Sequence, residues 1–174
     1  MSGKDNILLK LLDRSGNKLH GMLYRLTLDA DVAEDLMQDL FTRLCELKKP
    51  ASIKNLEAYA CRIAINLAFD RRRKQGSLIR LSETLTDHKT PQVDRQLIRN
   101  EELQHILDAA EQLSGLTREC FVLRYIEQMD YDAIAERVQK TTQQVRGLCS
   151  KAIQRIRQIL NDQNASFYKE AINE

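Results

Sequence analysis

The most informative part of the sequence is residues 130–160, which read DYDAIAERVQKTTQQVRGLCSKAIQRIRQIL. The spacing of its apolar residues predicts a short helix over about 131–138 and a longer one from 142 to about 160. Only three residues separate the two helices, and Thr141 with Gln144 fits a capping box at the start of the second. A short helix, a three-residue turn and a longer basic helix predict a helix-turn-helix, which places its second helix in the major groove of DNA.

The second of these helices has an apolar side and a polar side. Its inward side is expected to consist of Val145, Leu148, Cys149, Ala152, Ile153 and Ile156. Its outward side is expected to consist of Gln143, Arg146, Gly147, Ser150, Lys151 and Gln154. Because Arg and Gln side chains can each make two hydrogen bonds to base edges, the outward side is a candidate base-reading surface.

Gly147 is unusual inside a helix, where glycine costs about 1 kcal/mol relative to alanine. One interpretation is that the missing side chain lets the helix backbone approach DNA closely. The other is that glycine relieves crowding against the preceding helix. The first interpretation is favoured, and the second stays open.

The composition predicts an all-α protein. The chain has 174 residues, enough for one domain or two small ones, and 43% of them are hydrophobic and 30% charged, as in soluble globular proteins. Only 2 residues are Pro and 6 are Gly, while Leu, Ala, Glu, Gln, Arg and Lys are common. This balance favours helices over strands.

Neither export nor metal binding is predicted. The polar start does not resemble a signal peptide, and no apolar stretch approaches the roughly 20 residues of a membrane span, so we expect a cytoplasmic protein. The four cysteines are far apart and never form C-x-x-C, which predicts reduced core residues: Cys45, Cys61, Cys120 and Cys149. No metal or cofactor is expected.

The net charge of only +2 hides a strong segregation of charge along the chain. Residues 29–46 hold six acids against one Arg, and residues 101–136 hold nine acids against two Arg. Residues 48–74 hold eight bases against two acids, and residues 137–161 hold six bases and no acid. Two basic stretches indicate a polyanion partner, and two acidic stretches indicate a second, different surface.

Helical spacing also covers the first part of the chain. Apolar residues after Asp31 predict a helix that Asp31 caps, with Glu34 at the capping-box position. One or two helices are expected upstream, broken near residues 15–17. A further strong helix is expected over about 55–74, which ends in a run of cations.

Residues 76–96 lose the helical pattern and predict a linker with at most short helical pieces. Helical spacing resumes at about residue 97 and leads, after a break at Ser114 and Gly115, into the helix-turn-helix. The predicted organisation is therefore two small helical domains, residues 1–75 and 97–174, joined by residues 76–96.

These stretches resemble the conserved regions of bacterial sigma factors, in the order that the family has them. Residues 33–41, AEDLMQDLF, resemble its second region, and residues 58–70, AYACRIAINLAFD, resemble its promoter-melting segment. Residues 118–136 and the helix after them resemble its fourth region. Because no domain separates the two regions, the resemblance is to the small extracytoplasmic-function class, and it covers roughly residues 7–160.

The resemblance implies a transcription-initiation factor that binds core RNA polymerase and promoter DNA. One helix would dock on the clamp helices of the largest polymerase subunit through Asp35, Gln38, Asp39 and Phe41. The helices ahead of the recognition helix would meet the polymerase flap. Family members are often held inactive by an anti-sigma factor, which would be a further partner.

The resemblance also implies the contacts with DNA. Asn66 matches the family asparagine that helps hold unstacked bases of the minus-ten element, and Arg146, Gly147 and Lys151 match positions that face the minus-thirty-five element. Single-stranded DNA needs cations along its backbone, and five residues would supply them: Arg62, Arg71, Arg72, Arg73 and Lys74.

The sequence departs from the family pattern at several positions. Tyr59 replaces the usual Trp of the melting segment, and Ser114 replaces a usual Pro. Gln139 replaces the Gly of the helix-turn-helix turn, and Gln143-Gln144 replaces the Gly-Thr that usually opens the recognition helix. Gln143 and Gln144 are therefore predicted to read bases that the usual pair does not.

Two other classes of function remain open at this stage. A stand-alone regulator with a carboxy-terminal helix-turn-helix would bind duplex DNA without polymerase, and a helical adaptor would bind only proteins. An enzyme is not expected, because the sequence has no Gly-rich phosphate loop, no H-E-x-x-H and no nucleophile elbow.

Overall fold

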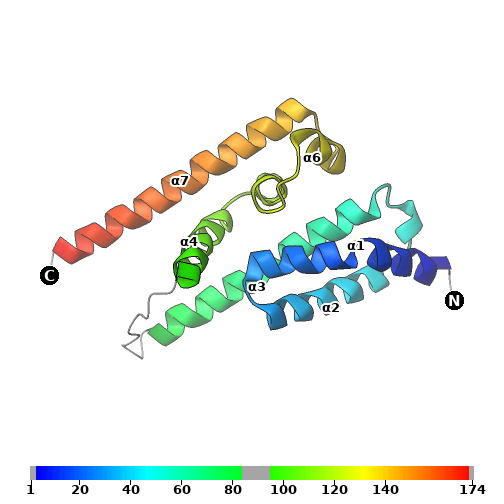
Figure 1. Cartoon of the computed structure of the whole chain (residues 1–174), viewed down its shortest axis with the longest axis horizontal. Helices are drawn as coiled ribbons and strands as arrows, with labels where there is room; N and C mark the ends of the chain where they lie inside the picture. The colour runs from blue at the N-terminus through cyan, green and yellow to red at the C-terminus, as the bar shows by residue number, and fades with distance from the viewer. Residues whose placement is uncertain (1–2, 84–94, 173–174) are drawn as a thin grey trace. The chain divides into compact units, whose positions relative to one another are not determined.

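The computed structural model describes the backbone of residues 3–83 and 95–172 and the side chains of residues 6–76 and 101–163. The described backbone is helical apart from short turns and contains no strand, which confirms the predicted all-α fold (Figure 1). None of the described helices is apolar over a stretch long enough to cross a bilayer. The chain forms two compact units, the first built on Met1–Arg80 and the second on most of the remainder.

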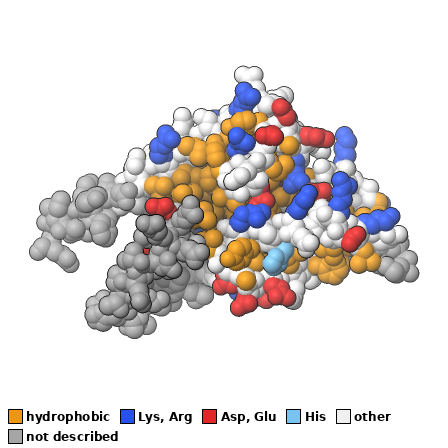
Figure 2. All heavy atoms as spheres, viewed as in Figure 1, with side chains coloured by type: hydrophobic (Ala, Val, Ile, Leu, Met, Phe, Trp, Pro, Cys, Tyr) orange, Lys and Arg blue, Asp and Glu red, His pale blue; other side chains and the backbone are white. Residues whose placement is uncertain are grey.

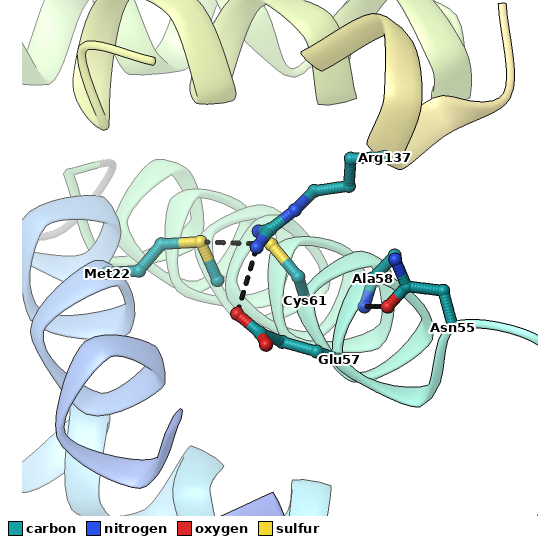
Figure 3. Close-up of polar contacts among 6 residues, drawn as sticks. All are labelled: Met22, Asn55, Glu57, Ala58, Cys61 and Arg137. Atoms are coloured by element: carbon teal, nitrogen blue, oxygen red, sulfur yellow. Dashed lines mark hydrogen bonds and ion pairs between the residues drawn. The ribbon is translucent and has the colours of Figure 1, made fainter. Parts of the chain in front are cut away.

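The first unit consists of α1 (Gly3–Thr27), α2 (Ala30–Glu46), a short 3₁₀ turn (Pro50–Ser52) and α3 (Leu56–Glu83). Helix α1 packs along α2, and α3 meets α1 where Cys61 Sγ lies 3.6 Å from Met22 Sδ (Figure 3). The largest fully buried side chains of this unit are Leu23, Leu26, Leu40, Leu44, Ile65 and Phe69. Each of them contributes roughly 1.5–3 kcal/mol by leaving water.

Helix α1 is continuous, so the predicted break near residues 15–17 is wrong. Ser15 is only 2% exposed, and a Cβ placed on Gly16 would meet no atom within 4 Å. Leu11 and Leu19 are both buried on either side of this point. Their burial outweighs the roughly 1 kcal/mol that a glycine costs inside a helix.

The starts of α2 and α3 are fixed by side-chain caps. Asp29, rather than the predicted Asp31, caps α2 by accepting a hydrogen bond of 3.0 Å from the backbone N–H of Val32. At the start of α3, Asn55 Oδ1 accepts a hydrogen bond of 2.9 Å from the N–H of Ala58, as the predicted start at about residue 55 requires (Figure 3).

Helix α3 continues to Glu83, so the first part of the predicted linker is helical. Residues 75–83 read QGSLIRLSE, which contains one glycine and no proline, and nothing in this stretch forces the helix to stop. The rest of the predicted linker up to residue 94 lies outside the described residues, and the next helix begins at Arg95.

The second unit consists of α4 (Arg95–Ala110), α5 (Gly115–Phe121), a wide π-helical turn (Val122–Ile126), most of α6 (Tyr131–Val138) and α7 (Thr142–Ile172). Its largest fully buried side chains are Leu107, Cys120, Val122, Leu123, Ile134 and Val145. Helix α7 extends twelve residues beyond the predicted end at Leu160, because no proline or glycine follows Gly147. It packs against both α4 and α5.

The cysteines follow the prediction with one exception. Cys61, Cys120 and Cys149 are buried and form no disulfide, as expected for reduced core residues. Cys45 forms no disulfide either but is exposed, because it lies on the outward side of α2. The prediction that all four are core residues is therefore wrong for Cys45.

Candidate nucleic-acid interface

The helix-turn-helix forms as predicted, and hydrogen bonds fix its turn. The N–H of Thr141 donates to Gln144 Oε1 over 3.0 Å, and the N–H of Gln144 donates to Thr141 Oγ1 over 3.2 Å. This reciprocal pair is the predicted capping box. In addition, Thr142 Oγ1 donates to Asp132 Oδ1 over 2.6 Å, which ties the start of α7 to the start of α6.

The turn contains a residue in the left-handed region of backbone space. Gln139 has φ of 55°, and the N–H of Lys140 donates to the carbonyl of Ala135 over 3.0 Å. Residues other than glycine adopt this conformation at a cost of roughly 1 kcal/mol. The departure at Gln139 therefore falls at a position where the backbone itself favours glycine.

The outward side of α7 is as predicted, and four of the six predicted inward residues are buried, whereas Leu148 and Ile153 are half-buried. On the inward side Val145, Cys149, Ala152 and Ile156 are at most 5% exposed. On the outward side six residues are exposed to solvent: Gln143, Arg146, Gly147, Ser150, Lys151 and Gln154. The exposed side thus carries one arginine, one lysine and amide and hydroxyl groups, with no acidic residue among them.

Gly147 lies on the open side of this helix. A Cβ built on it would meet no atom within 4 Å. The interpretation that glycine relieves crowding against the preceding helix is therefore wrong. Close approach of another molecule to the α7 backbone is the interpretation that fits this open surface.

Gln144 differs from the other predicted base readers. Although its side chain is exposed, its amide oxygen accepts the Thr141 N–H in the capping box. Bidentate recognition of adenine needs both the amide oxygen and the amide nitrogen. The cap holds the Gln144 amide against the start of α7 and so competes with bidentate reading of a base, whereas Gln143 is exposed and takes no part in the cap.

The predicted phosphate-binding cations of α3 lie in different environments. Arg62 and Lys74 are exposed, and Asn66 beside them is half-buried. Arg71 lies 4.0 Å from the Asp35 carboxylate of α2, and Arg73 forms an ion pair with Asp70.

Arg72 is the exception among these cations. It is only 5% exposed, and its Nη1 donates to the carbonyl of Leu26 at the end of α1 over 3.2 Å. A side chain committed to the core in this way does not follow a DNA strand along the surface. This placement argues against phosphate binding by Arg72, which stays a prediction; in the structure the side chain joins α3 to α1.

The outward side of α2 is acidic and carries one exposed ring. Asp35, Gln38 and Asp39 are exposed, and Phe41 is 40% exposed although it is a large apolar residue. In Figure 2, acidic side chains gather at the lower edge of the drawn face, over the start of α2. An exposed aromatic side chain flanked by polar residues is typical of a protein-docking surface.

Sequence reasoning missed a groove between α2 and α3. Its volume is about 300 Å³, and it is lined by Leu36, Asp39, Arg43, Leu67, Asp70, Arg71, Arg73 and Lys74. The groove places one predicted docking residue, Asp39, beside three predicted phosphate-binding cations. No local sequence signal marks it, because the two helices that form its walls meet only in the folded unit.

The buried thiols of the second unit do not resemble a reactive centre. Burial raises the pKa of Cys120 to about 12, and it also raises the pKa of Cys149. The Sγ of Cys149 lies 3.7 Å from the carbonyl oxygen of Cys120. Both thiols therefore stay protonated near neutral pH and serve as core packing.

Two family models match the chain, Sigma-70 region 2 over residues 11–78 and Sigma-70, region 4 over residues 103–156. The ferric citrate uptake sigma factor FecI of Escherichia coli (strain K12) is 24% identical over 125 residues, which cover 70% of this chain and 72% of that protein.

Two solved structures match most of the chain. The sigma factor RpoE in complex with the anti-sigma factor NepR from Bartonella quintana has 23% identity and a TM-score of 0.47, over 90% of this chain and 96% of that chain. CnrH in complex with the cytosolic domain of CnrY has 18% identity and a TM-score of 0.49, over 92% and 91%.

Proposed function

The chain belongs to the sigma-70 family of RNA polymerase sigma factors, with regions 2 and 4 and the organisation of the extracytoplasmic-function class, and from this membership we propose which residues perform each step of initiation. As a sigma factor it binds core polymerase, recognises promoter DNA and is not an enzyme. The match to region 2 over residues 11–78 overturns the alternative of a stand-alone helix-turn-helix regulator.

The first step is docking on core polymerase through the outward side of α2. Asp35, Gln38 and Asp39 supply exposed polar groups, and Phe41 supplies an apolar ring that is costly to leave in water. Aromatic residues surrounded by polar groups anchor many protein interfaces. This surface would contact the clamp helices of the largest subunit, while the helices before α7 would contact the flap.

The second step is capture of the melted minus-ten element by α3. Arg62 and Lys74 are exposed cations, and Arg71 and Arg73 hold ion pairs with carboxylates that DNA phosphates would have to displace. Asn66 would hold an unstacked base. Because surface ion pairs contribute little stability, their exchange for phosphate contacts costs little.

The third step is recognition of the minus-thirty-five element by the outward side of α7. Arg146 would contact a base edge, Lys151 and Ser150 a base edge or a phosphate, and Gln143 a further base. Gly147 would let the backbone come close to the groove. The single observation that carries this step is the exposed, acid-free side of α7 in a capped helix-turn-helix.

Two further expectations belong to this proposal. The protein would act in the cytoplasm, where the polymerase and the chromosome are. An anti-sigma factor stays a predicted partner; the complexes with NepR and CnrY are properties of the two solved relatives.

The test is reconstitution with bacterial core RNA polymerase. The purified protein is expected to bind core enzyme and to direct transcription from fragmented genomic DNA, with start sites that share two spaced sequence elements. A well-characterised sigma factor with the same core serves as the activity control. Failure to bind an active core, in a preparation free of inhibitor, would refute the assignment of the α2 surface, and start sites without a shared upstream element would refute that of the α7 surface.

A further inference from the structure

Tyr131, the first residue of α6, contacts two arginines through its ring. The guanidinium carbon of Arg146 lies over the ring at 5.4 Å from its centroid, and that of Arg124 lies over it at 4.5 Å. Both distances fall within the roughly 6 Å over which a cation is attracted to an aromatic face. Arg146 is the exposed arginine on the outward side of α7, whereas Tyr131 and Arg124 are half-buried.

The ring itself is held in place by the fold. Tyr131 lies beside Tyr125 of the π-helical turn, where burial and the neighbouring Tyr131 side chain raise the pKa of the Tyr125 hydroxyl. Its neighbour Asp132 accepts a hydrogen bond from Thr142 at the start of α7. Arg124 is fixed in turn, because its Nη1 donates to the carbonyl of Met129 over 2.8 Å. The platform under Arg146 therefore belongs to a network that joins the π-helical turn, α6 and α7.

We propose that Tyr131 is a positioning residue for promoter recognition, whose ring holds the Arg146 side chain in the conformation that reads a base of the minus-thirty-five element. This inference rests on the proposed function of α7.

The physical reason is pre-organisation of a flexible side chain. A free arginine samples many rotamers, and each must be given up when it forms a bidentate contact with a base. Stacking on an aromatic ring restricts those rotamers before DNA arrives. The attraction acts on the guanidinium from the side of the ring and leaves the N–H groups that point away from the ring for the base edge.

The test measures promoter discrimination by polymerase that carries each sigma variant. Transcription is scored on the preferred promoter and on every single base-pair variant of its minus-thirty-five element. Arg146→Ala first identifies the base pair that Arg146 reads, as the position where discrimination is lost. At that position Tyr131→Leu is expected to lower discrimination by about 2- to 5-fold, while Tyr131→Phe, which keeps the ring, stays close to the wild type.

A double-mutant cycle separates positioning from general damage to the fold. In the Arg146→Ala background, Tyr131→Leu is expected to cause no further loss at that base pair. Thermal melting checks that Tyr131→Leu is folded at the assay temperature; should it melt, Tyr131→Met, whose unbranched side chain adapts to the site without a ring, takes its place.

The results of these assays test the role of Tyr131 separately from the proposed function of α7. Loss of discrimination in Arg146→Ala together with none in Tyr131→Leu would overturn the role of Tyr131 and leave the proposed function of α7 standing. Unchanged discrimination in Arg146→Ala itself would overturn both. Equal losses in Tyr131→Phe and Tyr131→Leu would assign the effect to the hydroxyl rather than to the ring and would also overturn the inference.

Discussion

At the scale of single residues, a substitution of Gly147 should change the stability of the fold and the binding of DNA in opposite directions. Its position inside α7, with open space where a Cβ would lie, means that Gly147→Ala introduces no clash. We expect this change to raise the free energy of unfolding by about 1 kcal/mol, through helix propensity alone. We expect it also to weaken promoter-dependent transcription, since the added methyl group would keep the backbone away from the groove.

Gly16→Ala is the matched control for this prediction. Gly16 is likewise inside a helix and has no atom within 4 Å of an added Cβ, but it lies on α1 in the other unit. It should raise stability by a similar amount and leave promoter strength unchanged. If Gly147→Ala stabilises the protein and transcription stays at the wild-type level, the close approach of DNA to α7 is refuted.

Arg72 and Arg73 are neighbours in sequence with different roles. Arg72→Ala leaves the Leu26 carbonyl without its hydrogen bond in a buried environment, so we expect the free energy of unfolding to fall by about 1–3 kcal/mol. Arg73→Ala removes only an exposed ion pair and should cost less than about 0.5 kcal/mol. Urea denaturation of both variants checks this prediction, and losses of equal size would contradict it.

At the scale of elements, the turn of the helix-turn-helix carries a measurable strain. Replacement of Gln139, whose φ is 55°, by glycine should raise the stability of the second unit by up to about 1 kcal/mol, because glycine adopts this conformation without steric cost. Lys140→Gly is the control. Lys140 does not have a positive φ, so glycine there should only lower stability, by about 0.4–1 kcal/mol.

Thermal unfolding of these two variants gives opposite shifts if the left-handed backbone at Gln139 is strained. A lower melting temperature for Gln139→Gly would show instead that its side chain stabilises the turn more than its backbone strains it. The promoter specificity of both variants should stay as in the wild type, since neither position is among the proposed base readers.

Helix faces could be predicted from the sequence better than helix ends. The inward and outward sides of α7 follow from apolar spacing alone, and the Thr141–Gln144 capping box follows from two residue types at a fixed offset. The choice of Asp29 over Asp31 as the cap of α2 could not be predicted, because both are good caps. The conformation of Leu28, with φ of 59°, ends α1 and leaves Asp29 in the extended geometry that a cap needs.

The carboxy-terminal ends of α3 and α7 could not be predicted from the local sequence either. A loss of apolar periodicity shows where a helix leaves the core. It does not show where the helical backbone ends. Neither stretch contains a proline, so the helical backbone continues after the buried face has ended. The same limit explains Arg72, whose partner Leu26 is 46 residues away and is brought near only by the packing of α3 on α1.

At the scale of the whole molecule, docking on polymerase and recognition of DNA are proposed to use different surfaces. A change of charge on the α2 surface should therefore affect docking first. Asp35→Arg combined with Asp39→Arg changes the charge of the α2 surface by four units, since each acid is replaced by a base. Like charges placed across an interface cost several kcal/mol, so we expect affinity for core polymerase to fall by about 100-fold or more. Both side chains are exposed, so circular dichroism should show unchanged helix content.

Asp13→Arg with Asp162→Arg makes the same change in net charge on exposed positions of α1 and α7 and is the matched control. Affinity that falls only in the α2 pair assigns docking to that surface, because the summed charge is equal in the two variants. Equal loss in both would mean that polymerase senses overall charge and not the α2 surface. Wild-type affinity in the α2 pair would move the docking surface elsewhere, and Phe41, exposed beside those acids, would then lack a partner that explains its exposure.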